Sequence, residues 1–313
     1  MAQFTIYRST DSGAPTLSGT AGSLITVLDA VLVNGYGAKA AAGWTKAFSG
    51  TNKAAYKNGG GCQMYFRIDD SAPSAGTLAR IRGFETMSDV DTGTGAFPTT
   101  TQQTNGLFIL KSSTADSTNR PWIILADSST CYCFFLFSSL TTYTAFTMGE
   151  FYSFVNGDNY RNLLIARTVE NTTATGSTEV LELVSNNSNT TSGHYFPRGH
   201  TGLGGSVAFA KLGDNAKSGG SSNLLGAIPF TNPEDGGLYL SPLWISDLST
   251  TPIKGVRGRL RGLWHFLHPI TSVADGDTVT GTGSLNGRTF LFIKQSGGSA
   301  LYTMETSNTL ETN

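Results

Sequence analysis

After residue 61 the dominant period of this chain is two, the period of β-strands, and turn-forming residues separate the strands that it predicts. Residues 107–111 and 121–127 are short, continuously apolar runs, and Ser, Thr, Asn, Asp and Gly stand between them and their neighbours. An amphipathic helix would instead repeat its apolar residues every three to four positions. Runs of this kind indicate strands that are covered on both faces, so the sequence predicts a mainly β fold.

The composition agrees with a folded, turn-rich β protein. Hydrophobic residues make up 39% of the 313 residues, charged residues only 14% against a typical ~25%, and Gly contributes 38. A disordered chain normally has few aromatic residues, whereas this one has 18 Phe, 11 Tyr and 4 Trp. We therefore expect one or two antiparallel β-sandwich or barrel-like modules, with one short N-terminal helix and long Gly-rich arms.

Four regions are predicted along the chain. Residues 1–60 hold an N-terminal strand, the helix and a Gly-rich aromatic arm, and residues 61–185 form a first β-rich module. Residues 186–226 are rich in Gly and Ser, which predicts an arm or a linker. Residues 227–313 form a second β-rich portion.

Turn-forming residues predict two hairpins in the first β-rich module. One covers residues 121–137, where Ser128-Ser129-Thr130 separates two apolar runs. The other covers residues 151–167, with its turn at Asn156-Gly157-Asp158.

The only convincing amphipathic helix begins at Ser23. Ser23 is placed to cap its free amides, and Asn34-Gly35 provides a left-handed stop. Its apolar face is formed by residues at helical spacing, namely Leu24, Val27, Leu28, Val31 and Leu32.

Large rings follow the helix in a background of Gly, Ala, Ser and Lys with no strand or helix period. These rings are Tyr36, Trp44, Phe48 and Tyr56. A compact loop anchored by its rings fits this pattern. A plain surface excursion lying over the core fits it as well.

Three stretches resemble segments of virion structural proteins of tailed bacteriophages. They are LDAVLVNGYGAKAAAGWTKAFSGTNKAAYK (28–57), GEFYSFVNGDNYRNLLIA (149–166) and RGRLRGLWHFLHP (257–269). The resemblance implies a particle component, such as a head, neck or tail accessory protein. It brings no catalytic residues with it.

Charge and cysteine content narrow the range of partners and compartments. The formal net charge of −1 gives no long-range field that would attract a nucleic acid or an anionic membrane, so neither is an expected partner. Cys62, Cys131 and Cys133 are too few for a disulfide framework and fit small buried residues in a reducing cytoplasm. No export signal and no run of ~20 apolar residues is visible. The expected location is the virion, assembled in the bacterial host cytoplasm.

Reactive side chains do not form a recognisable site in the sequence, so we expect no enzymatic activity and no cofactor. A pair of structural histidines explains His265 and His268 better than a zinc site, while His194 and His200 leave open a metal across a trimer axis. Carboxylates that glycoside hydrolysis would need lie beside Gly and Ser, as turn residues do. They are Asp69, Asp70, Glu85, Asp89 and Asp91.

The most distinctive charged feature is an arginine ladder at Arg257, Arg259 and Arg261, which an extended strand places on one side. Three neighbouring cations repel one another unless a partner's carboxylates meet them or solvent surrounds an edge strand. With the rings of the aromatic stretch, the ladder completes the candidate assembly interface: Tyr36, Trp44, Phe48, Arg257, Arg259 and Arg261.

The sequence thus predicts a structural component of a tailed-phage virion that contacts other virion proteins and copies of itself. The arms at residues 36–61 and 186–226 would become ordered on neighbouring subunits. The alternative is a host-receptor or glycan-binding module of a tail fibre or baseplate, with Tyr36, Trp44 and Tyr195 stacking on a host surface glycan.

Overall fold

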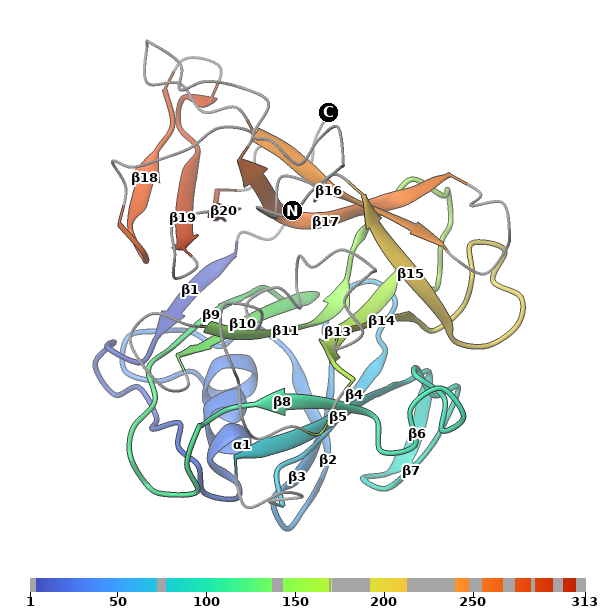
Figure 1. The fold of residues 1–313 in the computed structure, drawn as a ribbon, viewed down its shortest axis with the longest axis horizontal. Coiled ribbons are helices and arrows are strands. Elements are labelled where there is room, and N and C mark those ends of the chain that lie inside the picture. The colour runs from blue at the N-terminus through green and yellow to red at the C-terminus, as the bar shows by residue number, and fades with distance from the viewer. Residues whose placement is uncertain are drawn as a thin grey trace, which may run out of the picture.

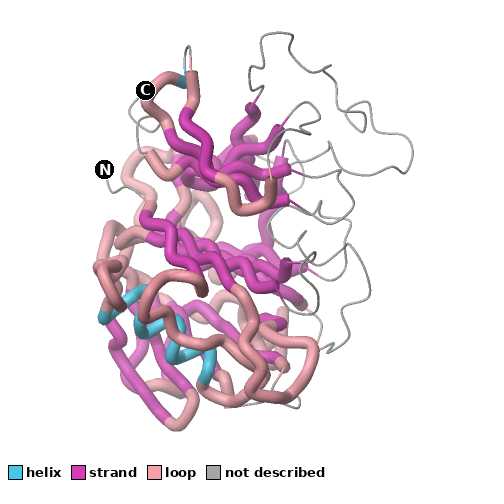
Figure 2. The backbone as a smooth tube through the Cα atoms, turned by 90° about the vertical axis from the view of Figure 1, so that its left-hand side faces the viewer, coloured by secondary structure: helices cyan, strands magenta, loops and turns pink. Residues whose placement is uncertain are grey.

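A computed structural model describes residues 4–71, 77–136, 143–168, 170, 192–212, 240–247, 255–266, 274–282, 285–294 and 301–307. The fold is mainly β, with one short helix, as the apolar runs predicted. Figures 1 and 2 show the strands in three layers, one above another, with the helix in the lower part of the molecule. All strand pairs between the layers and within them are antiparallel.

The lower layer is a sheet of neighbouring strands. In order these are β2 (Thr45–Gly50), β3 (Lys53–Lys57), β4 (Tyr65–Asp69), β5 (Leu78–Phe84) and β8 (Leu107–Leu110). A small separate ribbon, β6 (Thr86–Asp89) with β7 (Thr92–Thr94), lies beside it. At its other edge β8 pairs with β13 (Asn162–Arg167), so the sheet curls upward into the middle layer.

The middle layer holds the most deeply buried strands. Their order is β1 (Thr5–Arg8), β9 (Trp122–Ala126), β10 (Thr130–Leu136), β11 (Tyr143–Glu150), β13 and β14 (Ser192–Phe196). The predicted hairpin over residues 121–137 is confirmed as β9 and β10.

The upper layer continues the sheet from β14. Its strands are β15 (Val207–Leu212), β16 (Leu240–Asp247), β17 (Val256–Phe266), β20 (Leu301–Glu305), β19 (Thr289–Lys294) and β18 (Thr278–Thr280). The two-residue strand β12 (Tyr152–Ser153) pairs with β17. A long curled sheet therefore supplies all three layers.

Two hydrophobic cores lie on the two faces of the middle layer. Trp122 and Ile124 of β9 belong to the lower core, and Ile123 and Leu125 belong to the upper one. Successive strand residues point to opposite faces, so a strand between two cores must be apolar at every position. This explains the continuous apolar runs and confirms that their strands are covered on both sides.

The helix is confirmed, but its N-terminal cap is not the predicted one. Helix α1 (Ser23–Leu28) continues as a π-helical turn over Asp29–Asn34, and Gly35 follows with φ 76°. The Ser23 hydroxyl donates to the carbonyl oxygen of Ser18 instead of capping the helix. The carboxylate of Asp70 accepts the Leu24 amide at 2.9 Å and takes that place. No helix in the described part of the chain is long and apolar enough to cross a bilayer.

Three regions differ from the sequence-based expectation. Residues 36–61 contain the β2–β3 hairpin, and β3 pairs with β4, so this region is a part of the sheet and not an arm. The strands around Asn156-Gly157-Asp158 do not pair with each other, because β12 joins β17 while β13 joins β11. Of the predicted 186–226 arm, residues 192–212 supply β14 and β15, and the remainder lies outside the described residues.

Candidate functional site

The aromatic rings of the predicted assembly interface pack largely against other residues of the same chain. Trp44 is buried, and its indole nitrogen Nε1 donates to the carbonyl oxygen of Asp127 at 2.7 Å. Tyr36 and Phe48 are half-buried, and Phe48 stacks on Tyr65 with ring centroids 6.2 Å apart. Trp44 therefore presents no side-chain surface to a partner, while Tyr36 and Phe48 present part of theirs.

Arg257, the first residue of the arginine ladder, forms a buried ion pair with Asp158. Its Nε donates to Oδ2 at 3.1 Å and its Nη2 to Oδ1 at 3.0 Å, and both side chains are almost fully buried. The guanidinium also lies over the rings of Phe151 and Phe196. A two-bond arginine–carboxylate contact is strong and fixes orientation, so this cation is neutralised inside the protein.

Arg261 is also paired within the chain. Its guanidinium lies 2.7 Å from the Asp127 carboxylate and donates to the Thr130 hydroxyl at 2.9 Å. Arg259 lies over the ring of Tyr152, 5.0 Å from its centroid. The expectation of a solvated edge strand is wrong, because β17 pairs with β16 on one side and with β12 and β20 on the other. The carboxylates that meet Arg257 and Arg261 come from the chain itself.

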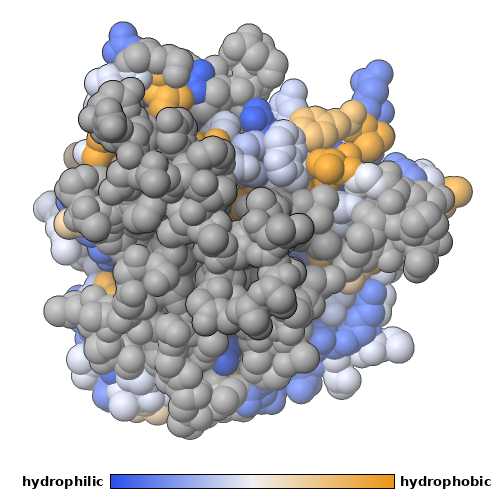
Figure 3. Space-filling model, turned by 45° about the horizontal axis from the view of Figure 1, so that its top comes forward, coloured by the Kyte–Doolittle hydropathy of each residue, from blue (hydrophilic) through white to orange (hydrophobic). Residues whose placement is uncertain are grey.

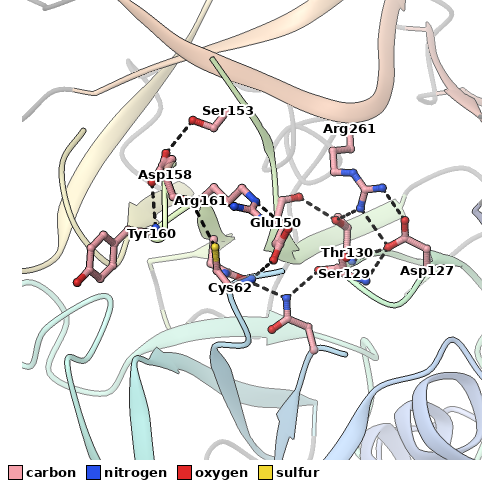
Figure 4. A network of polar contacts seen from close by, with 12 residues as sticks. Cys62, Asp127, Ser129, Thr130, Glu150, Ser153, Asp158, Tyr160, Arg161 and Arg261 are labelled. Atoms are coloured by element: carbon pink, nitrogen blue, oxygen red, sulfur yellow. Dashed lines mark hydrogen bonds and ion pairs between the residues drawn. The ribbon is translucent and has the colours of Figure 1, made fainter. Parts of the chain in front are cut away.

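A surface pocket of about 540 Å³ opens between these ion pairs. Most of its lining residues come from the end of β11, the short strand β12 and the following turn, and from the turn between β9 and β10. Its lining consists of Gly61, Ser128, Ser129, Glu150, Phe151, Tyr152, Ser153, Phe154, Val155, Asn156, Gly157, Asp158, Arg161 and Arg261. Figure 4 shows the polar side chains that surround it.

One side of the pocket is held by Glu150 and its partners. The Glu150 carboxylate pairs with Arg161 at 3.1 Å and accepts the backbone amide of Cys62. Arg161 and the Cys62 thiol both donate to the carbonyl oxygen of Asp158, at 3.0 and 3.4 Å. The Asp158 carboxylate in turn accepts the Ser153 hydroxyl at 2.8 Å. These contacts fix the turn after β12 against the loop before β4.

The opposite side is held by Asp127. Its carboxylate accepts the amides of Ser129 and Thr130, each at 2.8 Å, as well as the Arg261 guanidinium. The Thr130 hydroxyl donates to the carbonyl oxygen of Glu150, which joins the two sides. The pocket therefore has a preorganised polar wall in which the charges are matched in pairs.

The surroundings of Cys62, the thiol beside the pocket, disfavour its ionised form. Burial raises the pKa of the Cys62 thiol, and the nearby Glu150 charge raises it further, so the thiol is uncharged at neutral pH. A reactive cysteine needs the opposite shift. The aromatic pair Tyr152 and Phe154, with ring centroids 5.7 Å apart, gives the pocket an apolar side next to its polar wall.

The second and third segments that resemble virion proteins line this pocket, and the first contacts the neighbouring Asp127 through the buried Trp44. Trp44, from residues 28–57, and Arg261, from residues 257–269, both bind Asp127. Thr130, beside Asp127, donates to Glu150 from residues 149–166. The pairing of β12 with β17 also places the second and third segments side by side.

Sequence reasoning missed several residues of the pocket. Glu150, Asp158 and Arg161 are acids and a base spread along one segment, with no spacing that marks them as a group. The signal that was present is indirect: they belong to the second resembling segment and surround its Asn-Gly-Asp turn.

The candidate histidines, cysteines and Tyr195 pack against other side chains or lie outside the described atoms. His194 is buried beside the Phe209 ring, and the sulfurs of Cys131 and Cys133 lie 3.5 Å apart in the core. His200 is half-buried, as is Tyr195, which packs against the lower core. The side chain of His265 and the whole of residue His268 lie outside the described atoms. Among the described residues, no group of three or more His, Cys, Asp or Glu is arranged to hold a metal ion.

Most of the candidate carboxylates are paired with cations. Asp69 and Asp91 contact Arg67, Asp70 contacts Lys111, and Glu85 contacts Arg198. Asp89 is exposed in β6.

Comparison of the chain with models of known protein families and with curated proteins finds no match.

Proposed function

We propose that this protein is a structural component of a tailed-phage virion, on the capsid exterior, in the neck or in the tail. It acts through contacts with copies of itself and with other virion proteins, after assembly in the cytoplasm of the bacterial host. The observation that carries the proposal is that two of the three virion-like segments, residues 149–166 and 257–269, line one pocket and pair with each other through β12 and β17. Segments far apart in a chain that meet in space form one surface, and such a surface can serve one binding task.

An exposed apolar patch beside that pocket gives the proposed contact its chemistry. The patch consists of Phe154, Val155 and Val256, which are 48%, 36% and 44% exposed. The ring of Phe154 contacts the ring of Trp244, with centroids 5.7 Å apart. Figure 3 shows apolar residues exposed among polar ones on the face that it draws. Exposed apolar groups rimmed by polar residues mark contact surfaces between proteins.

The patch is held in place before any partner arrives. The backbone amide of Phe154 donates to the carbonyl oxygen of Arg257 at 2.8 Å, and the side chain of Arg257 is fixed by Asp158. A preorganised surface loses less conformational entropy on association than a loose one. Burying the exposed parts of these side chains would remove apolar area from water, worth roughly 25 cal/mol per Å² before the entropic cost of association is subtracted.

The test combines particle composition with a surface variant. Purified particles of a phage that carries this gene are analysed by mass spectrometry, and immunogold labelling shows where on the particle the protein lies. The double variant Phe154→Ser/Val155→Ser is expected to lower its copy number in particles several-fold. Leu203→Ser is the matched control, because Leu203 is 77% exposed and lies outside the patch. Absence of the protein from purified particles would refute the proposal.

A second function is favoured by the pocket itself. The rings of Tyr152 and Phe154 next to hydroxyl and amide groups of Ser128, Ser153 and Asn156 match the stacking faces and hydrogen-bonding edges of a sugar. The paired charges favour a neutral host glycan over an acidic one. This would make the protein a host-receptor or glycan-binding module of a tail fibre or baseplate.

Glycan arrays and calorimetry separate the two functions. Binding of a neutral glycan that is lost in Tyr152→Ala, with the fold retained in circular dichroism, supports the module. Failure of every glycan to bind at millimolar concentration would leave assembly as the only one of the two that stands.

A further inference from the structure

A second polar pocket, of about 250 Å³, lies on the lower sheet, on the outer face of β4 and β5. Arginines line it from both strands. Arg67 of β4 stands directly opposite Arg82 of β5, and Arg80 lies two residues before Arg82. Residues two apart on a strand share a face, as do directly opposite residues of an antiparallel pair, so all three guanidinium groups belong to one side of the sheet.

Arg67 is already neutralised by carboxylates. Its Nη2 contacts Asp69 at 3.1 Å and also contacts Asp91, while its Nε donates to the carbonyl oxygen of Val90 at 2.9 Å. Lys53 shares Asp91 at 3.1 Å. The acids of this pocket are therefore used by Arg67 and Lys53.

Arg82 differs because it has no carboxylate partner among the described residues. Its Nη2 donates only to the main-chain carbonyl oxygens of Gln103 and Thr104. Its Nε is buried and has no hydrogen-bond acceptor among the residues that the structure describes. The same holds for the Nε of Arg80, whose Nη2 contacts Glu170 at 3.3 Å. Burial lowers the pKa of Arg82, and the facing Arg67 charge lowers it further. A buried N–H group without an acceptor is costly, and so is a like charge placed directly opposite.

We propose that this pocket binds an oxyanion, a carboxylate, sulfate or phosphate group, that accepts hydrogen bonds from Arg80 and Arg82. One anion supplies the negative charge that Arg82 lacks, and its oxygens accept hydrogen bonds from the guanidinium groups that line the pocket. The planar guanidinium group matches the spacing of oxyanion oxygens and binds them with two parallel hydrogen bonds. Exposed Thr104 and Asn105 at the rim offer a hydroxyl and an amide to whatever carries the anion.

A pocket of about 250 Å³ has room for an oxyanion or for the carboxylate end of a single sugar acid. The site is independent of the Glu150–Asp158 pocket, because the two share no lining residue. The test of this oxyanion site is therefore independent of the test of the proposed function.

The experiment follows the arginine Nε–H signals of ¹⁵N-arginine-labelled full-length protein by NMR. Inorganic phosphate is titrated at constant ionic strength set with KCl, and D-glucuronate is titrated in parallel. Saturable shifts of two Nε–H signals, which disappear in Arg80→Gln and Arg82→Gln, are expected in the millimolar range or tighter. Glucuronate binding at least tenfold tighter than phosphate identifies a sugar acid as the ligand, and equal binding identifies a general oxyanion site.

Two variants serve as controls. Arg288→Gln removes the same charge from a half-exposed position directly before β19, in the upper layer, and is expected to leave the affinity unchanged. Arg82→Lys keeps the positive charge but not the forked donor geometry, and an affinity loss of tenfold or more is expected. If Arg82→Gln does not fold, Arg82→Lys is the variant used to test the contribution of Arg82. Shifts no larger than those caused by KCl alone, or unchanged binding in Arg82→Lys and Arg80→Gln, would overturn the proposal.

Discussion

The guanidinium of Arg261 lies 2.7 Å from the carboxylate of Asp127, although 134 residues separate the two in the chain. Arg261 belongs to β17 in the upper layer, and Asp127 directly follows β9 in the middle layer. The main-chain oxygen of Asp127 also accepts the indole of Trp44, which precedes β2 in the lower layer. One aspartate thus connects three layers and one wall of the pocket.

Removing this carboxylate is expected to destabilise the whole protein. Asp127→Ala leaves a mostly buried arginine without its partner and two amides without their acceptor, which typically costs about 3–5 kcal/mol. Urea denaturation followed by circular dichroism measures the free energy of unfolding. Asp89→Ala, at an exposed carboxylate of β6, should leave the transition where it was. Equal midpoints for wild type and Asp127→Ala would show that the contact carries no stability.

The buried pair of Asp70 and Lys111 predicts a pH dependence of stability. Burial raises the pKa of Asp70 to about 6, against the attraction of Lys111, whose ammonium lies 2.6 Å away. The folded-state pKa thus exceeds the unfolded value of about 3.9, and the native state binds more protons between these two values. The contribution of Asp70 to the free energy of unfolding therefore falls as the pH rises from about 4 to 6.

Comparison of wild type with Asp70→Asn isolates this contribution from those of other acids. The free-energy difference between wild type and variant should change by about 2–3 kcal/mol between pH 4 and pH 7, in the direction of a relatively less stable wild type at the higher pH. Urea denaturation at a series of pH values measures it. A difference that stays constant over this range would contradict the raised pKa.

Gly83 is predicted to tolerate no side chain. A Cβ at this position would lie 2.3 Å from the ring of Phe97, which is fully buried. Gly83→Ala must therefore displace the ring or the strand, at a cost of about 1–3 kcal/mol. Gly205→Ala is the matched control, since no atom lies within 4 Å of its added Cβ. Thermal unfolding of both variants shows whether only the first loses stability.

Cys62 should react slowly with thiol reagents, and its neighbours should tune the rate. The thiolate is the reactive form, and burial and Glu150 raise the pKa of Cys62 while Arg161 lowers it. Glu150→Gln is expected to speed alkylation by iodoacetamide at pH 8, and Arg161→Gln to slow it. Mass spectrometry of the Cys62 peptide over time gives both rates. The same rate in both variants would show that these charges do not act on the thiol.

Local patterns in the sequence predicted the elements well where one period was repeated without interruption. The runs that became β8 and β9 and the apolar face of the helix are confirmed as buried. The prediction of an arm over residues 36–61 was wrong. The strands β2 and β3 consist mostly of Ala, Ser, Gly and Lys, so apolar and polar residues alternate only weakly in them. The rings in that region looked like loop anchors, although Trp44 and Tyr56 belong to the lower core.

The sequence by itself determined a mainly β chain with one helix, since strand and helix periods and turn residues are properties of neighbouring positions. Only the tertiary structure decided which strands pair and which charges meet. The sequence places Ser23 as the helix cap, but in the structure Asp70 accepts the amide of Leu24. The sequence also places Arg257 and Arg261 in an unpaired ladder, but in the structure they form ion pairs with Asp158 and Asp127. These partners are distant in the chain, and the layers that bring them together are set by burying both faces of the middle sheet.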